Sequence, residues 1–111
     1  MPNSVSRPIS VILPSHGLAF AESAHGPRFR MAERADPFHK IIYVLQGQVA
    51  FSEIAHGQPL RATAGSALCV NAGVRHQLAD TETSTLLLLC FTPEFLQRDS
   101  ELGELWSQFT G

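Results

Sequence analysis

The chain has 111 residues, of which 44% are hydrophobic and 16% charged, and its formal net charge is -2. This length suits one domain with a hydrophobic core and is too short for a sensor joined to a separate DNA-reading domain. The eight Lys and Arg residues are scattered along the chain, whereas nucleic-acid binders more often carry a basic stripe and a high pI. We therefore expect no direct contact between this chain and nucleic acid.

The sequence also argues against a membrane segment and against export. The longest apolar run covers residues 86–91, far short of the roughly 20 residues that a transmembrane helix needs. The N-terminus lacks the apolar core of a signal peptide. Cys69 and Cys90 lie in apolar, strand-like runs, which is typical of buried free thiols in a reducing compartment. We expect a cytoplasmic protein with no membrane contact.

Short apolar runs alternate with turn signals along most of the chain, after a flexible tail expected at residues 1–8. The runs that predict strands cover residues 9–13, 18–21, 28–31, 39–45, 49–54, 58–63, 67–70, 75–79 and 83–91. Gly47 separates two of them and is typical of a hairpin turn, where glycine adopts positive φ at low cost. Arg28, Arg30 and Arg34 are interpreted as solvated surface residues. Many short strands with glycine turns predict an all-β sandwich or barrel over residues 9–91.

Residues 92–111 change from strand to helix patterning. Thr92 is a suitable N-cap and Pro93 suits the first helical position, while Asp99 can cap a second helix. We predict one broken helix or two short ones. Trp106 and Phe109 are too apolar to stay in water, so this segment is expected to pack on the barrel or on a partner subunit. The partner that we expect is a second copy of the chain, in a homodimer.

The stretch 65–80 resembles the second motif of the cupin family. That motif consists of a glycine, five residues, a proline, any residue, a glycine, two residues, a histidine, three residues and an asparagine. Gly65, Gly73 and His76 match it in register, while Asn71 stands in place of the proline and Asp80 in place of the asparagine. In the family, this histidine points into the barrel.

The first cupin motif ends in a glutamate, six residues and a glycine at the first hairpin, and Gly47 matches that glycine. Lys40 then occupies the glutamate position, and the two histidines that normally precede it are missing at residues 33–36. His39 directly precedes Lys40, so strand alternation aims the two side chains at opposite faces. The resemblance implies an all-β cupin double-stranded β-helix, an RmlC-like jelly-roll barrel, with one or two short C-terminal α-helices.

Cupin enzymes commonly bind a metal through three histidines and a glutamate, and of those positions this chain keeps only His76. Lys40 would place an ammonium where the metal needs a carboxylate. We therefore expect no metal cofactor. The alternative is one divalent transition metal at His76 and His39 with Glu33 or Asp36, which requires a register shift or a bulge that turns His39 inward.

Lys40 is also a candidate for ligand binding, because a cation inside an apolar barrel could receive a carboxylate, phosphate or phenolate. A structural ion pair of Lys40 with Asp80 or Asp36 is the competing interpretation, since buried charges need partners. The residues that we expect to bind a ligand are His76, Lys40, His39, Tyr43 and Asp80. None of them is expected to be catalytic.

The run from Asp36 to Gly47, the stretch 65–80, the leucine-rich strand and the C-terminal helices together look most like the N-terminal sensor domain of AraC-type transcription regulators. This resemblance implies an effector-sensing and dimerisation domain without catalysis, followed by a helix-turn-helix DNA-binding domain beyond Gly111. It also implies a small-molecule effector as a partner. Two alternatives are a stand-alone small metal-dependent cupin enzyme, either a dioxygenase or an isomerase, and a non-catalytic cupin that binds a sugar or a small acid.

Overall fold

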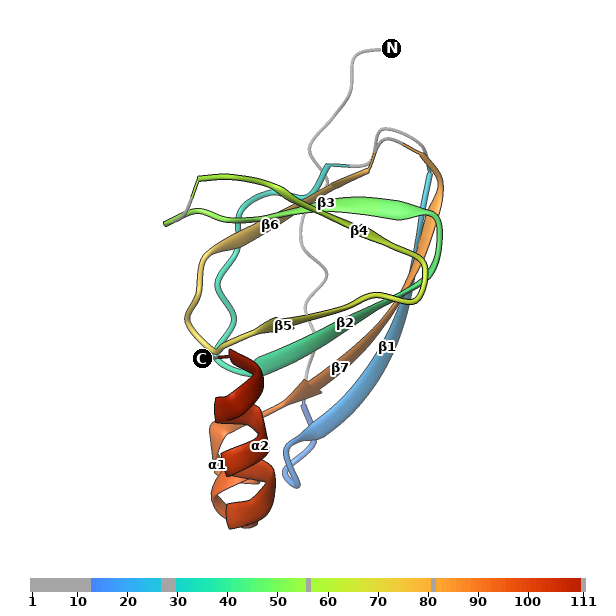
Figure 1. The fold of residues 1–111 in the computed structure, drawn as a ribbon. Helices are drawn as coiled ribbons and strands as arrows, with labels where there is room; N and C mark the ends of the chain where they lie inside the picture. The colour runs from blue at the N-terminus through green and yellow to red at the C-terminus, as the bar shows by residue number, and fades with distance from the viewer. Residues whose placement is uncertain (1–12, 27–29, 56, 81, 111) are drawn as a thin grey trace.

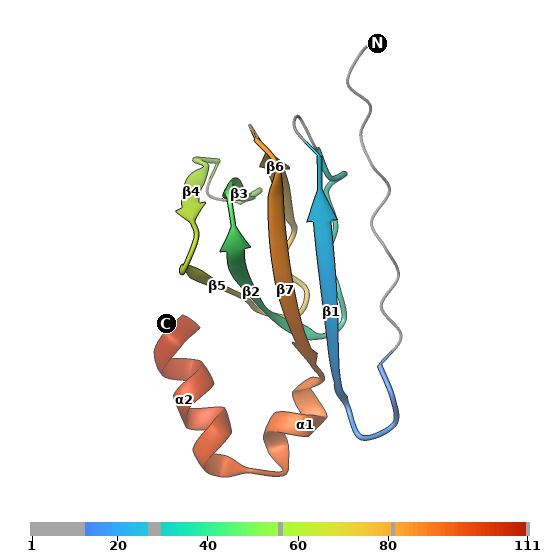
Figure 2. The same cartoon turned by 90° about the vertical axis from the view of Figure 1, so that its right-hand side faces the viewer.

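The computed structural model describes residues 13–26, 30–55, 57–80 and 82–110, which form two antiparallel sheets followed by two helices (Figure 1). The strands are β1 (Leu18–His25), β2 (His39–Gln46), β3 (Gln48–Glu53), β4 (Leu60–Thr63), β5 (Ala67–Val70), β6 (His76–Asp80) and β7 (Ser84–Phe91). The helices are α1 (Pro93–Gln97) and α2 (Ser100–Thr110). The four-stranded sheet has the order β1-β7-β2-β5 and the three-stranded sheet the order β4-β3-β6. Both helices lie at one end of the four-stranded sheet (Figure 2).

The predicted all-β class and the helical C-terminal segment are confirmed. β1 is longer than predicted and continues to His25, while β4 begins only at Leu60. Residues 1–12, which include the expected tail and most of the expected strand at 9–13, lie outside the described part of the chain. Residues 27–29 also lie outside it, and the expected strand at 28–31 is represented by an isolated bridge from Arg30 to Ala79.

Side-chain alternation along the strands fills the space between the two sheets. In β2, Ile42 and Val44 are buried between the sheets, while Ile41 and Tyr43 lie on the outer face. The core combines Ile42, Val44, Leu68, Val70 and Leu86 from the four-stranded sheet with Val49, Phe51, Ala62 and Leu78 from the three-stranded sheet. Each fully buried aliphatic or aromatic side chain contributes roughly 1.5–3 kcal/mol, so this core holds the sheets together.

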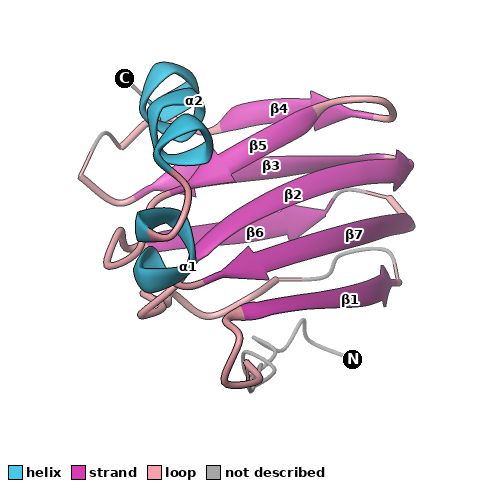
Figure 3. Cartoon of the chain, turned by 90° about the horizontal axis from the view of Figure 1, so that it is seen from below, coloured by secondary structure: helices cyan, strands magenta, loops and turns pink. Residues whose placement is uncertain are grey.

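The outer face of the four-stranded sheet is also apolar. Phe20, Leu89, Ile41 and Cys69 lie in one row across β1, β7, β2 and β5. Helices α1 and α2 cover one end of this sheet (Figure 3), whereas Phe20 stays exposed. Both cysteines are free, as expected, but only Cys90 is buried; Cys69 is half-buried because it belongs to this outer row.

The C-terminal segment takes the second of its two predicted forms, a pair of short helices. Thr92 caps α1 as expected, because its hydroxyl oxygen accepts a hydrogen bond from the Phe95 backbone N–H at 3.1 Å. Asp99 caps α2 by accepting hydrogen bonds from the backbone N–H groups of Glu101 and Leu102. Neither helix has the length and apolar character that crossing a membrane requires, as judged over the described residues.

Candidate functional site

The candidate site contains His76, the first residue of β6. The turn before it is built on Gly73, whose φ of +83° suits glycine. The His76 side chain is completely buried, and its Nδ1 lies 2.9 Å from the backbone oxygen of Val74. Arg75 points to the opposite face, where it is exposed and forms an ion pair with Glu33 at 2.9 Å. His76 thus faces inward and Arg75 outward, as strand alternation predicts.

A group of charged side chains lies just before β2 and at its start. Lys40 Nζ donates a hydrogen bond to Asp36 Oδ2 at 3.0 Å, and Arg34 Nε donates one to Asp36 Oδ1 at 2.9 Å. Lys40 is only 5% exposed, and Asp36 is also buried. The sequence offers Asp36 and Asp80 as partners for Lys40, and the structure pairs Lys40 with Asp36.

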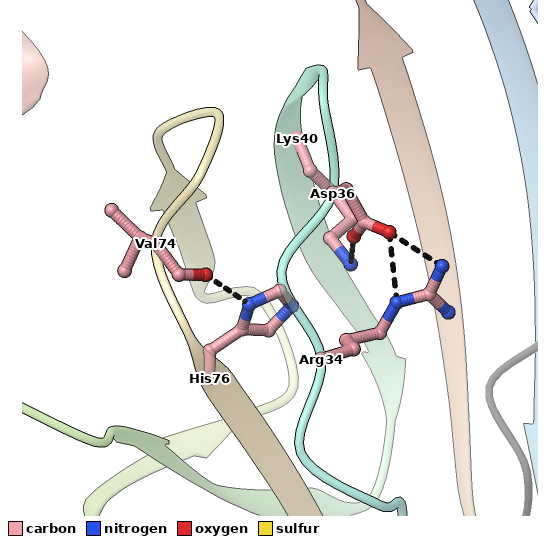
Figure 4. A network of polar contacts seen from close by, with 5 residues as sticks. All are labelled: Arg34, Asp36, Lys40, Val74 and His76. Atoms are coloured by element: carbon pink, nitrogen blue, oxygen red, sulfur yellow. Dashed lines mark hydrogen bonds and ion pairs between the residues drawn. The ribbon is translucent and has the colours of Figure 1, made fainter.

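Backbone hydrogen bonds hold this charged group beside His76. Arg34 and His76 exchange two N–H···O bonds, of 3.0 and 2.9 Å, and the Gly73 N–H donates to the backbone oxygen of Asp36 at 2.8 Å. The His76 ring points toward the segment that carries Arg34 and Asp36 (Figure 4). Arg34, Asp36, Lys40 and His76 together are called the polar cluster below.

Burial and neighbouring charges shift the pKa values within the polar cluster. Burial alone would raise the pKa of Asp36, but Lys40 and Arg34 outweigh it and hold that pKa below its usual value. Burial lowers the pKa of Lys40, while the Asp36 carboxylate opposes this shift and favours the charged ammonium. Burial, reinforced by the charge of Lys40, lowers the pKa of His76. At neutral pH the cluster therefore holds the cationic side chains of Lys40 and Arg34, the Asp36 carboxylate and a neutral His76 imidazole.

The second ring nitrogen of His76 has an unusual environment. When Nδ1–H donates to the backbone oxygen of Val74, Nε2 carries a lone pair that can accept a hydrogen bond. This nitrogen is buried and has no hydrogen-bond partner among the described residues. An unsatisfied buried polar atom costs about 1–3 kcal/mol, so a ligand group that donates a hydrogen bond to Nε2 would be stabilised there.

The structure does not bring all five expected ligand residues together. His39 lies on the outer face of β2, where its Nδ1 accepts a hydrogen bond from the Ala72 backbone N–H at 3.0 Å. Tyr43 lies on the same outer face and is 38% exposed. Both are therefore on the side of β2 opposite to Lys40. The backbone of Asp80 ends β6, but its side chain lies outside the described part of the structure.

The residues named for an alternative metal site do not form one. His39 lies on the outer face, Glu33 is held at the surface by its ion pair, and Asp36 already binds two cations. Over the described ranges, no group of three or more His, Cys, Asp or Glu side chains is placed to hold a metal ion. His76 is the one member of the named set that offers an unused lone pair to the interior, so this set does not fit a divalent metal.

Two residues at the site escape sequence-based prediction. Arg34 binds Asp36 instead of lying on a solvated surface. The spacing of these two residues could have revealed the contact, because residues i and i+2 of an extended segment share a face. Asn71 is more than a departure from the motif, since its Oδ1 accepts a hydrogen bond from Trp106 Nε1 at 2.7 Å. No local pattern links two residues so far apart in the chain.

Acidification below the usual histidine pKa of 6.5 is expected to destabilise the fold through His76 and His39. Burial lowers the pKa of both imidazoles, so the unfolded chain takes up protons that the folded chain resists. Their stabilising contribution is complete above pH 6.5 and declines as the pH falls toward the folded-state pKa values. Urea unfolding from about pH 7 to about pH 5 measures this decline. His76→Asn, which cannot titrate, should flatten the decline, and equal pH slopes in the two proteins would contradict the prediction.

Comparison with solved structures identifies the fold as a cupin. A cupin superfamily protein from Desulfitobacterium hafniense is 14% identical, with a TM-score of 0.66 over 75% of this chain and 74% of that chain. The polyketide cyclase RemF from Streptomyces resistomycificus is 18% identical, with a TM-score of 0.63 over 68% of this chain and 54% of that chain. A predicted oxalate decarboxylase from Thermotoga maritima is 20% identical, with a TM-score of 0.59 over 66% and 64% of the two chains. Likeness at these identities shows the shared fold alone.

The family comparison is more specific than the structural one. No curated protein matches the chain in sequence. The family model described as an AraC-like ligand binding domain matches residues 16–107, a range that includes the polar cluster and the Trp106 contact with Asn71. The chain therefore belongs to the family of AraC-like ligand-binding domains, which confirms the resemblance seen in its motifs.

Proposed function

We propose that this domain senses a small organic acid that binds between the two sheets at the polar cluster. The observation that carries this proposal is the buried Nε2 of His76, which has no partner among the described residues and lies in the same cluster as the buried Lys40 ammonium. A ligand that brings one negative charge and one hydrogen-bond donor would satisfy both features. Membership of a ligand-binding family supports a small-molecule effector.

A carboxylate that also carries a hydroxyl group matches the polar cluster best. The Lys40 ammonium has three N–H donors, of which one binds Asp36. A ligand carboxylate beside Lys40 would accept from another of them without displacing Asp36. A hydroxyl group on the same ligand would donate a hydrogen bond to His76 Nε2. Hydroxy acids should therefore bind more tightly than the corresponding unsubstituted acids.

The proposed role is sensing and dimerisation without catalysis, in a transcription regulator whose DNA-binding domain is not in this chain. Leu102, Leu105 and Phe109 recur at helical spacing on α2 and are exposed, with Phe109 at 74%. These three residues are called the α2 stripe below. A homodimer joined through α2 would bury the stripe, and exposed apolar patches of this kind mark interaction sites. The two free thiols fit a cytoplasmic location.

Replacing Lys40 with Met is expected to weaken the binding of organic acids by about 10- to 100-fold, because it removes a charge-assisted hydrogen bond worth about 1.5–3 kcal/mol. Calorimetric titration would use benzoate, 4-hydroxybenzoate and hexanoate as probes, with inorganic phosphate as a second class of acid. Arg75→Gln alters an exposed ion pair and is the matched control, which should bind the probes as the unmodified protein does.

The outcomes of this titration separate the parts of the proposal. If none of the acids binds, or if Lys40→Met binds them as tightly as the unmodified protein, the acid proposal is wrong. A preference for 4-hydroxybenzoate over benzoate that disappears in His76→Phe would assign the hydroxyl group to Nε2. The same preference in both proteins would remove His76 from the ligand site.

A stand-alone metal-dependent cupin enzyme is the alternative function, and the fold supports it. Two of the similar solved structures are a polyketide cyclase and a predicted oxalate decarboxylase. The Lys40 ammonium in the same cluster as His76 opposes this alternative, because a cation repels a divalent metal. Metal analysis of the purified protein would favour the enzyme if one transition metal per chain is retained and is lost in His76→Ala.

A further inference from the structure

We infer that Asn71 and His39 are positioning residues that couple the polar cluster to the position of helix α2 on the four-stranded sheet, which is called the seat of α2 below. This inference rests on the proposed function for the ligand that it involves. The coupling element is the turn between β5 and β6, residues 71–74, called the 71–74 turn. Its first two residues contact the groups that hold α2, and its last two contact the polar cluster.

On the helix side, the 71–74 turn holds Trp106 and His39. Asn71 Oδ1 accepts a hydrogen bond from Trp106 Nε1 at 2.7 Å, and the Ala72 N–H donates to His39 Nδ1 at 3.0 Å. The His39 ring centroid lies 5.1 Å from that of Trp106, and Phe91 packs edge-on against Trp106 at 4.9 Å. In α2, whose residues are all described, Trp106 alone is buried. These contacts therefore anchor the buried side chain of α2 to the sheet.

On the cluster side, the same turn holds Asp36 and His76. The Gly73 N–H donates to the backbone oxygen of Asp36 at 2.8 Å, and the Val74 backbone oxygen lies 2.9 Å from His76 Nδ1. The Val74 N–H also donates to the backbone oxygen of Asn71 at 3.2 Å and closes the turn. One closed turn thus contacts the segment that carries the buried carboxylate and the imidazole whose Nε2 lacks a partner among the described residues.

A closed turn of this size transmits a displacement, because its four residues are joined by an internal hydrogen bond. A shift of Asp36 or of the His76 ring moves the Gly73 and Val74 backbone groups. Because Asn71 belongs to the same turn, its Oδ1, which accepts the hydrogen bond from Trp106, moves with them. Coupling between two sites is reciprocal. A ligand that moves the polar cluster therefore changes the seat of α2, and a partner that binds the α2 stripe changes the polar cluster.

The first test uses Trp106, the single tryptophan of the chain, as a fluorescent reporter of the seat of α2. Asp36→Asn and Lys40→Met are combined in one protein, which neutralises the buried pair with side chains of similar size. We expect acrylamide to quench Trp106 about twofold more strongly in this double variant than in the unmodified protein. Arg75→Gln, at an exposed ion pair, is the control and should leave the quenching unchanged.

The second test runs in the opposite direction. Asn71→Ala removes the acceptor for Trp106 Nε1 and substitutes no residue of the polar cluster. The chemical shifts of the His76 ring nitrogens, followed by NMR through a pH titration, should differ from those of the unmodified protein. The midpoint of the His76 titration should also change. If Asn71 only anchored the helix, His76 would not respond. Glu104→Gln changes an exposed residue of α2 and is the matched control, which should move neither the Trp106 quenching nor the His76 signals.

Both tests are made without ligand, which separates this inference from the proposed function. If neither benzoate nor 4-hydroxybenzoate binds but both variants behave as expected, the coupling stands and the proposed ligand class is wrong. If 4-hydroxybenzoate binds without any change in Trp106 quenching, the proposed sensor function stands and the coupling is overturned. Unchanged quenching in the double variant, or unchanged His76 signals in Asn71→Ala, also overturns it. If the double variant does not fold, Asn71→Ala decides alone.

Discussion

Asp36→Asn is expected to lower the free energy of unfolding by about 3–5 kcal/mol, because it removes one partner of a buried ion pair. The Asp36 carboxylate accepts a hydrogen bond from Lys40 at 3.0 Å, and both side chains are buried. An amide cannot balance the charge of the ammonium, so the variant leaves a buried cation without its counter-ion. Urea denaturation at neutral pH measures the loss, which is a large part of the roughly 5–15 kcal/mol that stabilises an ordinary domain.

The pH dependence and a second substitution test the same explanation. The pKa of Asp36 lies below its usual value, so its stabilising contribution is present above about pH 4 and is lost as the pH falls through the folded-state pKa. Adding Lys40→Met to Asp36→Asn should restore part of the stability, because it removes the buried ammonium that lost its counter-ion, while Arg34 still faces an amide in place of the Asp36 carboxylate. Arg75→Gln breaks an exposed pair and should cost less than about 1 kcal/mol. A loss in Asp36→Asn no larger than that control would contradict the prediction.

Gly47→Ala is expected to cost about 3 kcal/mol or more, since it combines backbone strain with a steric clash. Gly47 joins β2 to β3 with φ at +79°. A Cβ atom at this position would run into the backbone oxygen of Thr83 and lie 3.0 Å from Cα of Ser84. Both neighbours are backbone atoms, and Ser84 begins β7, so relief of the clash requires the hairpin or the start of a central strand to move. Thermal or urea unfolding measures the effect.

Gly57→Ala is the matched control for Gly47→Ala. Gly57 has nearly the same backbone conformation, with φ at +76°, but a Cβ atom there would meet no atom of the described residues within 4 Å. Only the left-handed backbone penalty of about 1–2 kcal/mol applies to it. The difference between the two variants therefore isolates the clash with Thr83. Equal losses would show that the close approach of the hairpin to the start of β7 does not constrain residue 47.

Local signals account for the parts of the fold that the sequence predicts. The alternation of Ile42 and Val44 with Ile41, and the break at Gly47, locate the hairpin of β2 and β3 because each acts over a few residues. Thr92 likewise marks the start of α1. The order β1-β7-β2-β5 could not be predicted in this way. Both faces of β2 are apolar, so its pattern does not distinguish a neighbour in its own sheet from one in the facing sheet.

In the candidate site, too, local patterns predict some features, and contacts between distant segments decide the others. The cupin-like motif correctly predicts that His76 faces inward, and alternation puts Lys40 on the opposite side of β2 from His39. The choice of Asp36 over Asp80 as the partner of Lys40 depends on how the segment before β2 packs on β6, through contacts that no spacing reveals. The hydrogen bond from Trp106 to Asn71 has the same character, because it depends on where the helix docks.

The strand order of the four-stranded sheet also fixes when that sheet can form as the chain leaves the ribosome. Among the described strands, no two neighbours in the order β1-β7-β2-β5 are consecutive in the chain. β7 pairs with both β1 and β2, and it ends only at Phe91. The nascent chain therefore carries β2, apolar on both faces, with an unpaired edge until β7 has been synthesised. Such edges promote association between chains, so this is the interval in which a bound chaperone would protect the protein most.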